Sequence, residues 1–169
     1  MRLRTRLRNF KYINKTDMAY PSIYELKTTE ALTQRIGKLS KLSSANWGKM
    51  NVAQMLAHCC IPYEQIFGER NDKISGIMKF LMRYVFKKSM VNEVPYKQSL
   101  PTAPFFIMDD DKDFEKEQKR LLNYINKCQQ LGADGLVKQK HQSLGMLSAQ
   151  EWNNLLYKHL DHHLRQFGV

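Results

Sequence analysis

The stretch that decides the fold is SAQEWNNLLYKHLDHHLRQFG, residues 148–168. Ser148 and Glu151, three residues apart, form a capping box, which predicts that a helix begins at this point. Trp152 and Leu155 then follow at helical spacing, so one face of this helix is expected to turn toward a protein core.

Two histidines lie on that same face. His159 and His163 are four residues apart, which places them one helical turn from each other, about 6 Å along the axis. Imidazoles directed at a core need hydrogen-bond partners, or they share a cation. One interpretation is a buried histidine held by a backbone carbonyl, with the other histidines at the surface. The sharper interpretation is a metal site.

A pair of histidines leaves the coordination sphere of an ion incomplete, so a third ligand must come from elsewhere. His58 is the best candidate, because it is the only histidine on another predicted helix and lies at the edge of its apolar face. His141 is the second candidate for this third ligand. His162 is a geometric alternative to His163 as the partner of His159. Three nitrogens at about 2.1 Å from zinc, nickel or iron would leave a position for water or substrate, as in a catalytic site.

Other stretches also carry helix signals. Asn51 and Gln54 form a second capping box. Negative charge from Asp109 to Asp111 is expected to cap a later helix, which Gly132 should end. The predicted helices, besides the last, cover residues 25–40, 51–67, 74–88 and 112–131.

No convincing strand alternation interrupts these helices, so we expect an all-α bundle. Residues 91–110 contain three prolines and are predicted to be an extended surface loop. At 169 residues the chain has the length of one domain. We expect a single helical domain over residues 21–169, preceded by a basic, flexible tail over residues 1–20.

The stretch ISGIMKFLMRYVFKK, residues 74–88, is the most apolar of the chain. We expect it to be a core helix. Because basic residues border its apolar face, an amphipathic helix on a membrane surface is the alternative.

The net charge of +11 is weak support for nucleic-acid binding, because +5 of it falls in the first seventeen residues. Met18 offers an alternative translation start, which would leave those residues outside the functional protein. We therefore expect no nucleic-acid partner.

Three cysteines, Cys59, Cys60 and Cys128, provide no disulfide framework and suit a reducing compartment. We expect all three to be buried or half-buried. The opening residues lack the apolar region of a secretory signal, and no segment has the length of a membrane span. A cytoplasmic protein without integral membrane contact is the expectation.

Three motifs resemble one known superfamily. They are NWGKMNVAQMLAHC (46–59), HQSLGMLSAQEW (141–152) and HLDHHLRQFG (159–168). Together they resemble the DinB/YfiT-like superfamily of metalloenzymes, and more closely a branch known only as a domain of unknown function. The resemblance covers roughly residues 25–169.

This resemblance implies a four-helix bundle, here with an extra helix and loop insertion, that binds a divalent ion through three histidines. The family's histidine in the second helix matches His58, and its His-x-x-x-His in the last helix matches His159 and His163. A glutamine that follows after two further residues matches Gln166. The resemblance also implies frequent homodimers, and activities such as isomerisation and S-transfer from a low-molecular-weight thiol (bacillithiol, mycothiol or glutathione).

The functional hypothesis is a metal-dependent S-transferase or hydrolase that acts on a small electrophilic molecule. The ion would lower the pKa of a water or thiol at its open position. Gln54, Tyr63 and Gln166 are the candidates to orient the substrate, although Gln54 also has its capping role. The alternatives are a metal-stabilised scaffold without catalytic activity, and a basic module that binds nucleic acid or an anionic membrane.

Overall fold

The computed structural model describes residues 19–169, so the predicted basic tail lies almost entirely outside the described residues. The described part of the chain is mostly helical, with one small antiparallel hairpin, which confirms the all-α prediction. Its elements are α1 (Leu26–Gly37), α2 (Val52–Ile66), α3 (Gly76–Leu81), the π-helix η1 (Met82–Phe86), α4 (Lys87–Val91), the 3-10 helix η2 (Pro104–Phe106), α5 (Phe114–Leu136), β1 (Lys140–His141), β2 (Gly145–Met146) and α6 (Ala149–Gln166).

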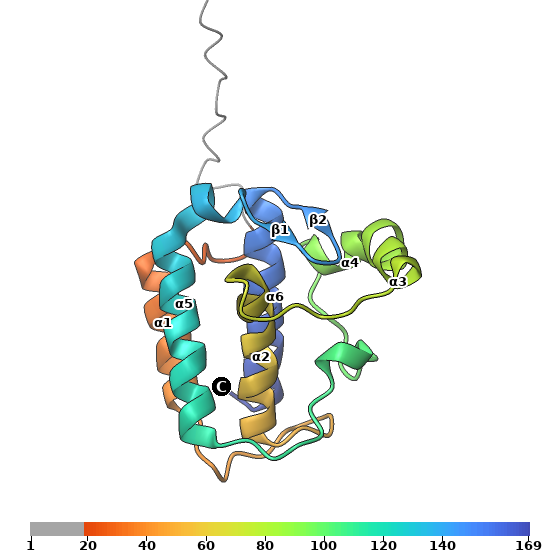
Figure 1. Cartoon of the computed structure of the whole chain (residues 1–169). Helices are drawn as coiled ribbons and strands as arrows, with labels where there is room; N and C mark the ends of the chain where they lie inside the picture. Colours follow the sequence, from red (N-terminus) through yellow and green to blue (C-terminus); the bar gives the residue numbers. More distant parts are fainter. Residues whose placement is uncertain (1–18) are drawn as a thin grey trace, which may run out of the picture.

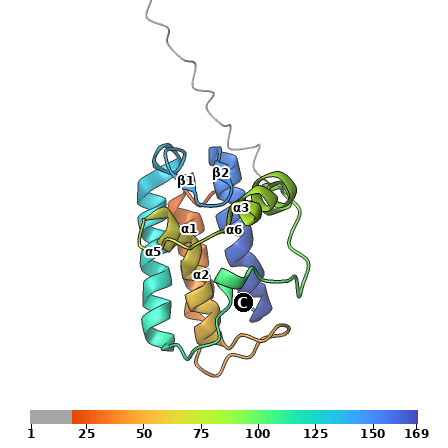
Figure 2. The same ribbon diagram turned by 45° about the vertical axis from the view of Figure 1, so that its right-hand side comes forward.

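The four longest of these helices run side by side and enclose the core (Figures 1 and 2). Helix α5 packs against α1 and α2, and α6 packs against α2 and α5. Each of the four turns an apolar stripe inward, because its large aliphatic residues recur at helical spacing. Their fully buried side chains include Ile36, Leu56, Leu121, Trp152 and Leu160.

Polar side chains cap the starts of α2, α5 and α6. The predicted capping boxes at Asn51 and Ser148 are both present, each with its reciprocal side-chain and backbone hydrogen bonds. The cap of α5 is Asp113, whose carboxylate accepts from the backbone N–H of Lys116 at 2.7 Å. The acidic triplet that we expected in this role lies just before it. Gly132 interrupts α5 with φ +66°, as its predicted stop requires, but one more helical turn follows.

The segment α3–η1–α4 lies at the edge of the molecule, beside the hairpin and outside the group of long helices (Figure 1). Met82 is the one buried residue of these three elements, and Met78 is partly buried against the core. The expectation of a core helix is therefore wrong for most of this segment. Helical periodicity indicated an apolar face but not whether a partner covers it.

One buried lysine fixes the loop that follows α4. Lys158 on α6 is only 2 % exposed. Its ammonium donates to the carbonyls of Ser89 and Asn92 at 2.9 Å and of Val94 at 3.1 Å. The Tyr96 ring lies 4.5 Å from the same nitrogen. Burial lowers the pKa of Lys158 to about 8, and these acceptors compensate the lost hydration. The proline-containing loop is thereby held against α6.

The hairpin β1–β2 was not predicted. Its strands pair Lys140 with Met146 and His141 with Gly145. Gly145 has φ +81°, which a side chain would rarely allow, and it lies close to the guanidinium of Arg83. Each strand has two residues, too few for an alternation pattern to show in the sequence. Among the described residues, no helix is long and apolar enough to cross a membrane.

Candidate metal centre

Three histidines from two distant parts of the chain meet between α2 and α6. The ring centroids of His58 and His159 are 4.9 Å apart, those of His58 and His163 4.6 Å, and those of His159 and His163 4.8 Å. One ring nitrogen from each histidine lies within 4.8 Å of the other two, a geometry that can hold a metal ion. Ligand nitrogens around a tetrahedral ion are ~3.4 Å apart, so small rotations of the rings would close the gap.

A backbone carbonyl fixes the proton on the His58 ring. The Nδ1 atom of His58 lies 3.0 Å from the carbonyl oxygen of Phe106, which belongs to η2. A carbonyl oxygen only accepts, so Nδ1 must carry the proton and donate. In the neutral ring Nε2 then has a free lone pair, and this atom faces the cluster. Such an outer hydrogen bond is what orients a metal-binding histidine.

The side chain of Gln166 fixes the proton on the His163 ring in the same way. Its Nε2 donates to the carbonyl oxygen of Trp47 at 2.6 Å, so its Oε1 is left to accept from Nδ1 of His163 at 2.8 Å. The unprotonated Nε2 of His163 is thereby available as a ligand. Gly48 makes room for this arrangement. It has φ +85°, and a Cβ on it would lie only 2.4 Å from Nε2 of Gln166.

The closest contact inside the cluster is between two nitrogens. Nε2 of His58 and Nε2 of His159 are 3.0 Å apart. Two lone pairs at this distance would repel, so either a proton or a cation must lie between them. Since the carbonyl of Phe106 keeps the His58 proton on Nδ1, the proton would be on His159. Replacing that one proton with a cation gives three nitrogens directed at one point.

Burial keeps these rings in the form that metals bind. Desolvation lowers the pKa of His58, lowers that of His159 well below its usual value, and lowers that of His163 to about 3. The neighbouring imidazoles add to this effect at His159 and His163, because a second positive charge would be repelled. All three are therefore neutral at physiological pH, and no proton has to leave a charged ring before a cation enters.

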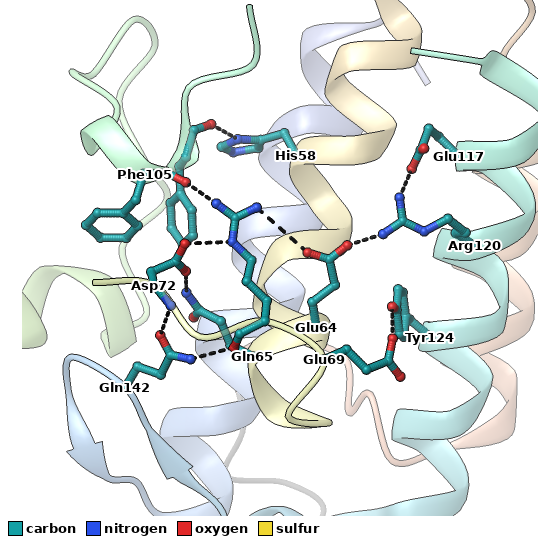
Figure 3. Close-up of polar contacts among 12 residues, drawn as sticks. His58, Glu64, Gln65, Glu69, Asp72, Phe105, Glu117, Arg120, Tyr124 and Gln142 are labelled. Atoms are coloured by element: carbon teal, nitrogen blue, oxygen red, sulfur yellow. Dashed lines mark hydrogen bonds and ion pairs between the residues drawn. The ribbon is translucent and has the colours of Figure 1, made fainter. Parts of the chain in front are cut away.

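An arginine network holds the η2 turn that carries the Phe106 carbonyl, by binding the neighbouring carbonyl of Phe105 (Figure 3). Arg70, just after α2, donates through Nη2 to the carbonyl of Phe105 at 2.6 Å and through Nε to Asp72 at 2.8 Å. Its other terminal nitrogen lies 3.8 Å from Glu64, which also pairs with Arg120 of α5. The η2 turn is thus tied to the far end of α2. No pattern in the sequence indicates this role of Arg70, because Phe105 is 35 residues away in a loop without periodicity.

Gln54 and Tyr63 are not brought to the cluster. The side-chain oxygen of Gln54 accepts from the backbone N–H of Asn51, and its Nε2 donates to the carbonyl of Asp110 at 3.2 Å. It therefore serves the helix cap. Tyr63 is buried where α2 meets α5, with its ring stacked on Tyr124 at 6.0 Å. Of the three orienting candidates, only Gln166 contacts a histidine of the cluster, and that contact orients the histidine itself.

The two alternative ligand candidates, His141 and His162, also lie outside the cluster. His141, on β1, packs against Trp152, and its Nδ1 accepts from the backbone N–H groups of Ser143 and Leu144 at 3.1 and 3.2 Å. Burial lowers its pKa to about 4. His162 is half-buried, with its ring 5.2 Å from that of His163.

A small pocket of about 120 Å³ borders His162, and none of the three clustered histidines is in its walls. Its walls are mostly aromatic and charged. They include the rings of Tyr20, Trp47 and Tyr96, and the charged groups of Lys158, Asp161 and Arg165. Asp161 is itself paired with Arg35 and Arg165, each at 2.8 Å.

The three cysteines are all buried and free, as expected. Burial raises the pKa of Cys59 well above its usual value and raises those of Cys60 and Cys128 to about 12. Thiols in this state are poor nucleophiles. Their role is packing.

Comparison with known proteins gives one assignment. No curated protein and no solved structure matches this sequence. One family model does, over residues 20–168, which is nearly the whole chain and includes all three clustered histidines. The chain belongs to the family described as "Protein of unknown function (DUF1569)".

Proposed function

We propose that His58, His159 and His163 bind one divalent ion, zinc, nickel or iron, and that the chain is a metal-dependent enzyme of the DinB/YfiT-like type acting on a small molecule. Under this proposal α1, α2, α5 and α6 are the four helices of the bundle. The segment from α3 to η2 is the insertion between its second and third helices.

The observation that carries the proposal is the fixed proton position on two of the rings. The Phe106 carbonyl and Gln166 each hold a proton on an outer Nδ1, so that the inner Nε2 atoms are free to bind an ion. A histidine buried only for packing would need one such partner and no second imidazole at 3.0 Å. Two oriented rings and a third within reach are what an ion requires.

The protein's own residues have separate tasks in this scheme. The histidines supply three neutral ligands, and the outer hydrogen bonds hold their rings. Burial of His58 and His163 limits access of bulk water. His159 is half-buried as a residue. When bound, the ion supplies a Lewis acid that makes a water or thiol nucleophilic at neutral pH.

The substrate is proposed to be small. His58 and His163 are buried, which leaves little room for a large molecule beside the ion. A small electrophile, with a low-molecular-weight thiol or water as the second reactant, is the substrate that this burial favours. The cysteines of the chain are too buried to provide the thiol, so a thiol reaction would need an external one.

Metal analysis tests the ligand assignment. Untagged protein and its His159→Ala variant would be purified without chelator, and their metal content measured by mass spectrometry. His141→Ala is the matched control, because it removes another buried histidine that lies outside the cluster. We expect about one divalent ion per chain in the wild type and the control, and a loss of most of it in His159→Ala. Equal content in all three proteins would refute the proposal.

Cobalt substitution separates an enzyme from a scaffold. If a coordination position is open, adding glutathione to the cobalt protein should produce a sulfur-to-cobalt charge-transfer band, and azide should also change the spectrum. A spectrum that no added thiol or anion changes would show a closed coordination sphere. That result would favour the metal-stabilised scaffold and contradict the enzyme.

A further inference from the structure

The segment α3–η1–α4 exposes apolar side chains that a surface helix would normally bury. Ile77 is 78 % exposed, Phe80 59 % and Tyr84 69 %. The rings of Phe80 and Tyr84 contact each other, with centroids 4.8 Å apart. Val85 and Phe86 continue the exposed surface. Single exposed apolar residues are ordinary, whereas a contiguous set on one segment indicates a binding surface.

The inner side of the segment is anchored, so this surface is held outward. Met82 is buried and Met78 packs against the core. At the C-terminal end, Lys87 pairs with Glu151 of α6 at 2.8 Å. The carbonyls that follow are held by Lys158. Rotation of the exposed residues into the core would break these contacts.

Cations border the apolar residues. The sequence from Gly76 to Val91 contains Lys79, Arg83, Lys87 and Lys88 and no acidic residue. Arg83, Lys87 and Lys88 line one side of an open groove, which also includes Tyr84 and Glu151. Because Glu151 offsets only one of the three cations, the groove carries net positive charge next to exposed rings.

Three kinds of partner would meet this surface differently. A second copy of the chain, packed on the same face, would place its own cations against these, which is unfavourable. A nucleic acid would neutralise the cations but would leave Ile77 and Phe80 in water. An anionic membrane surface offers phosphate and carboxylate groups to the cations and an apolar layer to the rings. It is the partner that matches both halves of the surface.

We propose that α3–η1–α4 is an interfacial element that docks this protein onto anionic membrane surfaces, with Ile77, Phe80 and Tyr84 entering the lipid boundary and Arg83 and Lys88 contacting lipid headgroups. The inference is independent of the metal site. It requires only that the segment stay helical and outward.

Vesicle flotation of the full chain tests this. The vesicles would be phosphatidylcholine alone, or phosphatidylcholine with about 30 % phosphatidylserine. We expect binding to the anionic vesicles only, weakening as salt rises from roughly 0.1 to 0.5 M. The double variant Phe80→Gln/Tyr84→Gln should reduce partitioning about tenfold or more, because it removes the apolar half of the contact. Its control is Leu26→Gln/Leu42→Gln, which changes two exposed apolar residues on other parts of the surface.

A second pair of variants tests the contribution of the cations on this surface. Arg83→Glu/Lys88→Glu should also lose about tenfold or more, whereas Lys116→Glu/Lys119→Glu on α5, with the same change in net charge, should bind as the wild type does. Circular dichroism would verify that every variant is folded.

Each remaining outcome counts against the proposal. Wild-type binding by both helix variants would mean that another part of the chain, such as the basic first residues, contacts the lipid. Equal loss in the charge control would indicate a net-charge effect only. If sedimentation instead shows a dimer that Phe80→Gln/Tyr84→Gln dissociates, without vesicle binding, a second copy covers the face.

Discussion

Folded proteins usually bury apolar side chains and expose polar ones, and the histidine cluster and the α3–η1–α4 segment depart from this rule in opposite directions. The first places polar rings inside the protein, and the second places apolar rings outside it. Inside, the Phe106 carbonyl and the Gln166 side chain hold the protons of two of the three rings in place. Outside, the apolar groups have no such partner within the described residues. The difference indicates which kind of partner each region binds. The histidine cluster is preorganised for an ion, whereas the exposed side chains of α3–η1–α4 suit a membrane surface.

The largest effect is expected from removing one ligand. His58→Ala should weaken the affinity for the divalent ion about 1,000-fold or more, which is ~4 kcal/mol, because two histidines cannot hold it. In the wild type, metal at 100 times its Kd should raise the free energy of unfolding by about 2.7 kcal/mol. Urea denaturation with and without metal measures this difference. If His58→Ala gains as much stability from metal as the wild type does, the cluster is not the metal site.

The loss of folding stability in acid tests whether the buried histidines are neutral in the folded protein. His141 is suited to this test because it is buried but lies outside the metal cluster. Its folded pKa of about 4 lies below the ordinary value of 6.5, so the unfolded chain binds the proton more tightly. The resulting stability is present above pH 6.5 and is lost as the pH falls toward 4, by about 3 kcal/mol. His141→Asn keeps an acceptor near the Nδ1 position but does not titrate in this range.

The measurement is the free energy of unfolding, from urea, at pH 7 and at pH 4.5. The metal-free wild type should lose more stability between the two than His141→Asn does. Identical losses would mean that the ring of His141 is already charged, or solvated, in the folded protein.

The hydrogen bonds behind the ligands should have an intermediate effect. Gln166→Leu removes the acceptor for His163, and Gly48→Ala displaces the same glutamine, so each should lower metal affinity about 10- to 100-fold. Gln129→Ala is the control, because this glutamine also donates to a carbonyl, that of Tyr24, but on α5. Competition with a coloured chelator gives the affinities. Unchanged affinity in both variants would show that His163 needs no outer partner.

The smallest effect is expected on the outer surface in the absence of membranes. Phe80→Gln should change the free energy of unfolding by no more than about 0.5 kcal/mol, because this residue is more exposed than buried and its ring contact is with the exposed Tyr84. Met82→Ala, two residues along the same segment but buried, should cost about 2 kcal/mol or more. Urea denaturation compares the two. A large loss in Phe80→Gln would mean that the ring packs against this chain and is not free for lipid.

Local signals in the sequence were sufficient for the starts of α2 and α6, because the capping boxes at Asn51 and Ser148 depend on residues three apart. Helical geometry allowed either His162 or His163 as the partner of His159. The apolar face of the helix favoured His163, and the family resemblance supported it. The choice of His58 depended on its being the only histidine on a second helix. In each case the deciding interaction is short-range or follows from one periodic face.

What the sequence did not predict depends on contacts between distant segments. The Phe106 carbonyl is 48 residues from His58, and Gln166 reaches Trp47 across 119 residues. No periodicity encodes such pairs. The same limit explains the α3–η1–α4 segment. Its amphipathic pattern was visible, but burial depends on whether another element covers the face, which is a property of the whole fold.

The most direct test of the central claim is anomalous diffraction from a crystal of the metal-loaded protein, recorded at the absorption edge of the bound ion. The account predicts one strong anomalous peak between α2 and α6, about 2.1 Å from Nε2 of His58, His159 and His163. A peak that contacts other residues, or no peak in a protein shown to contain metal, would contradict it.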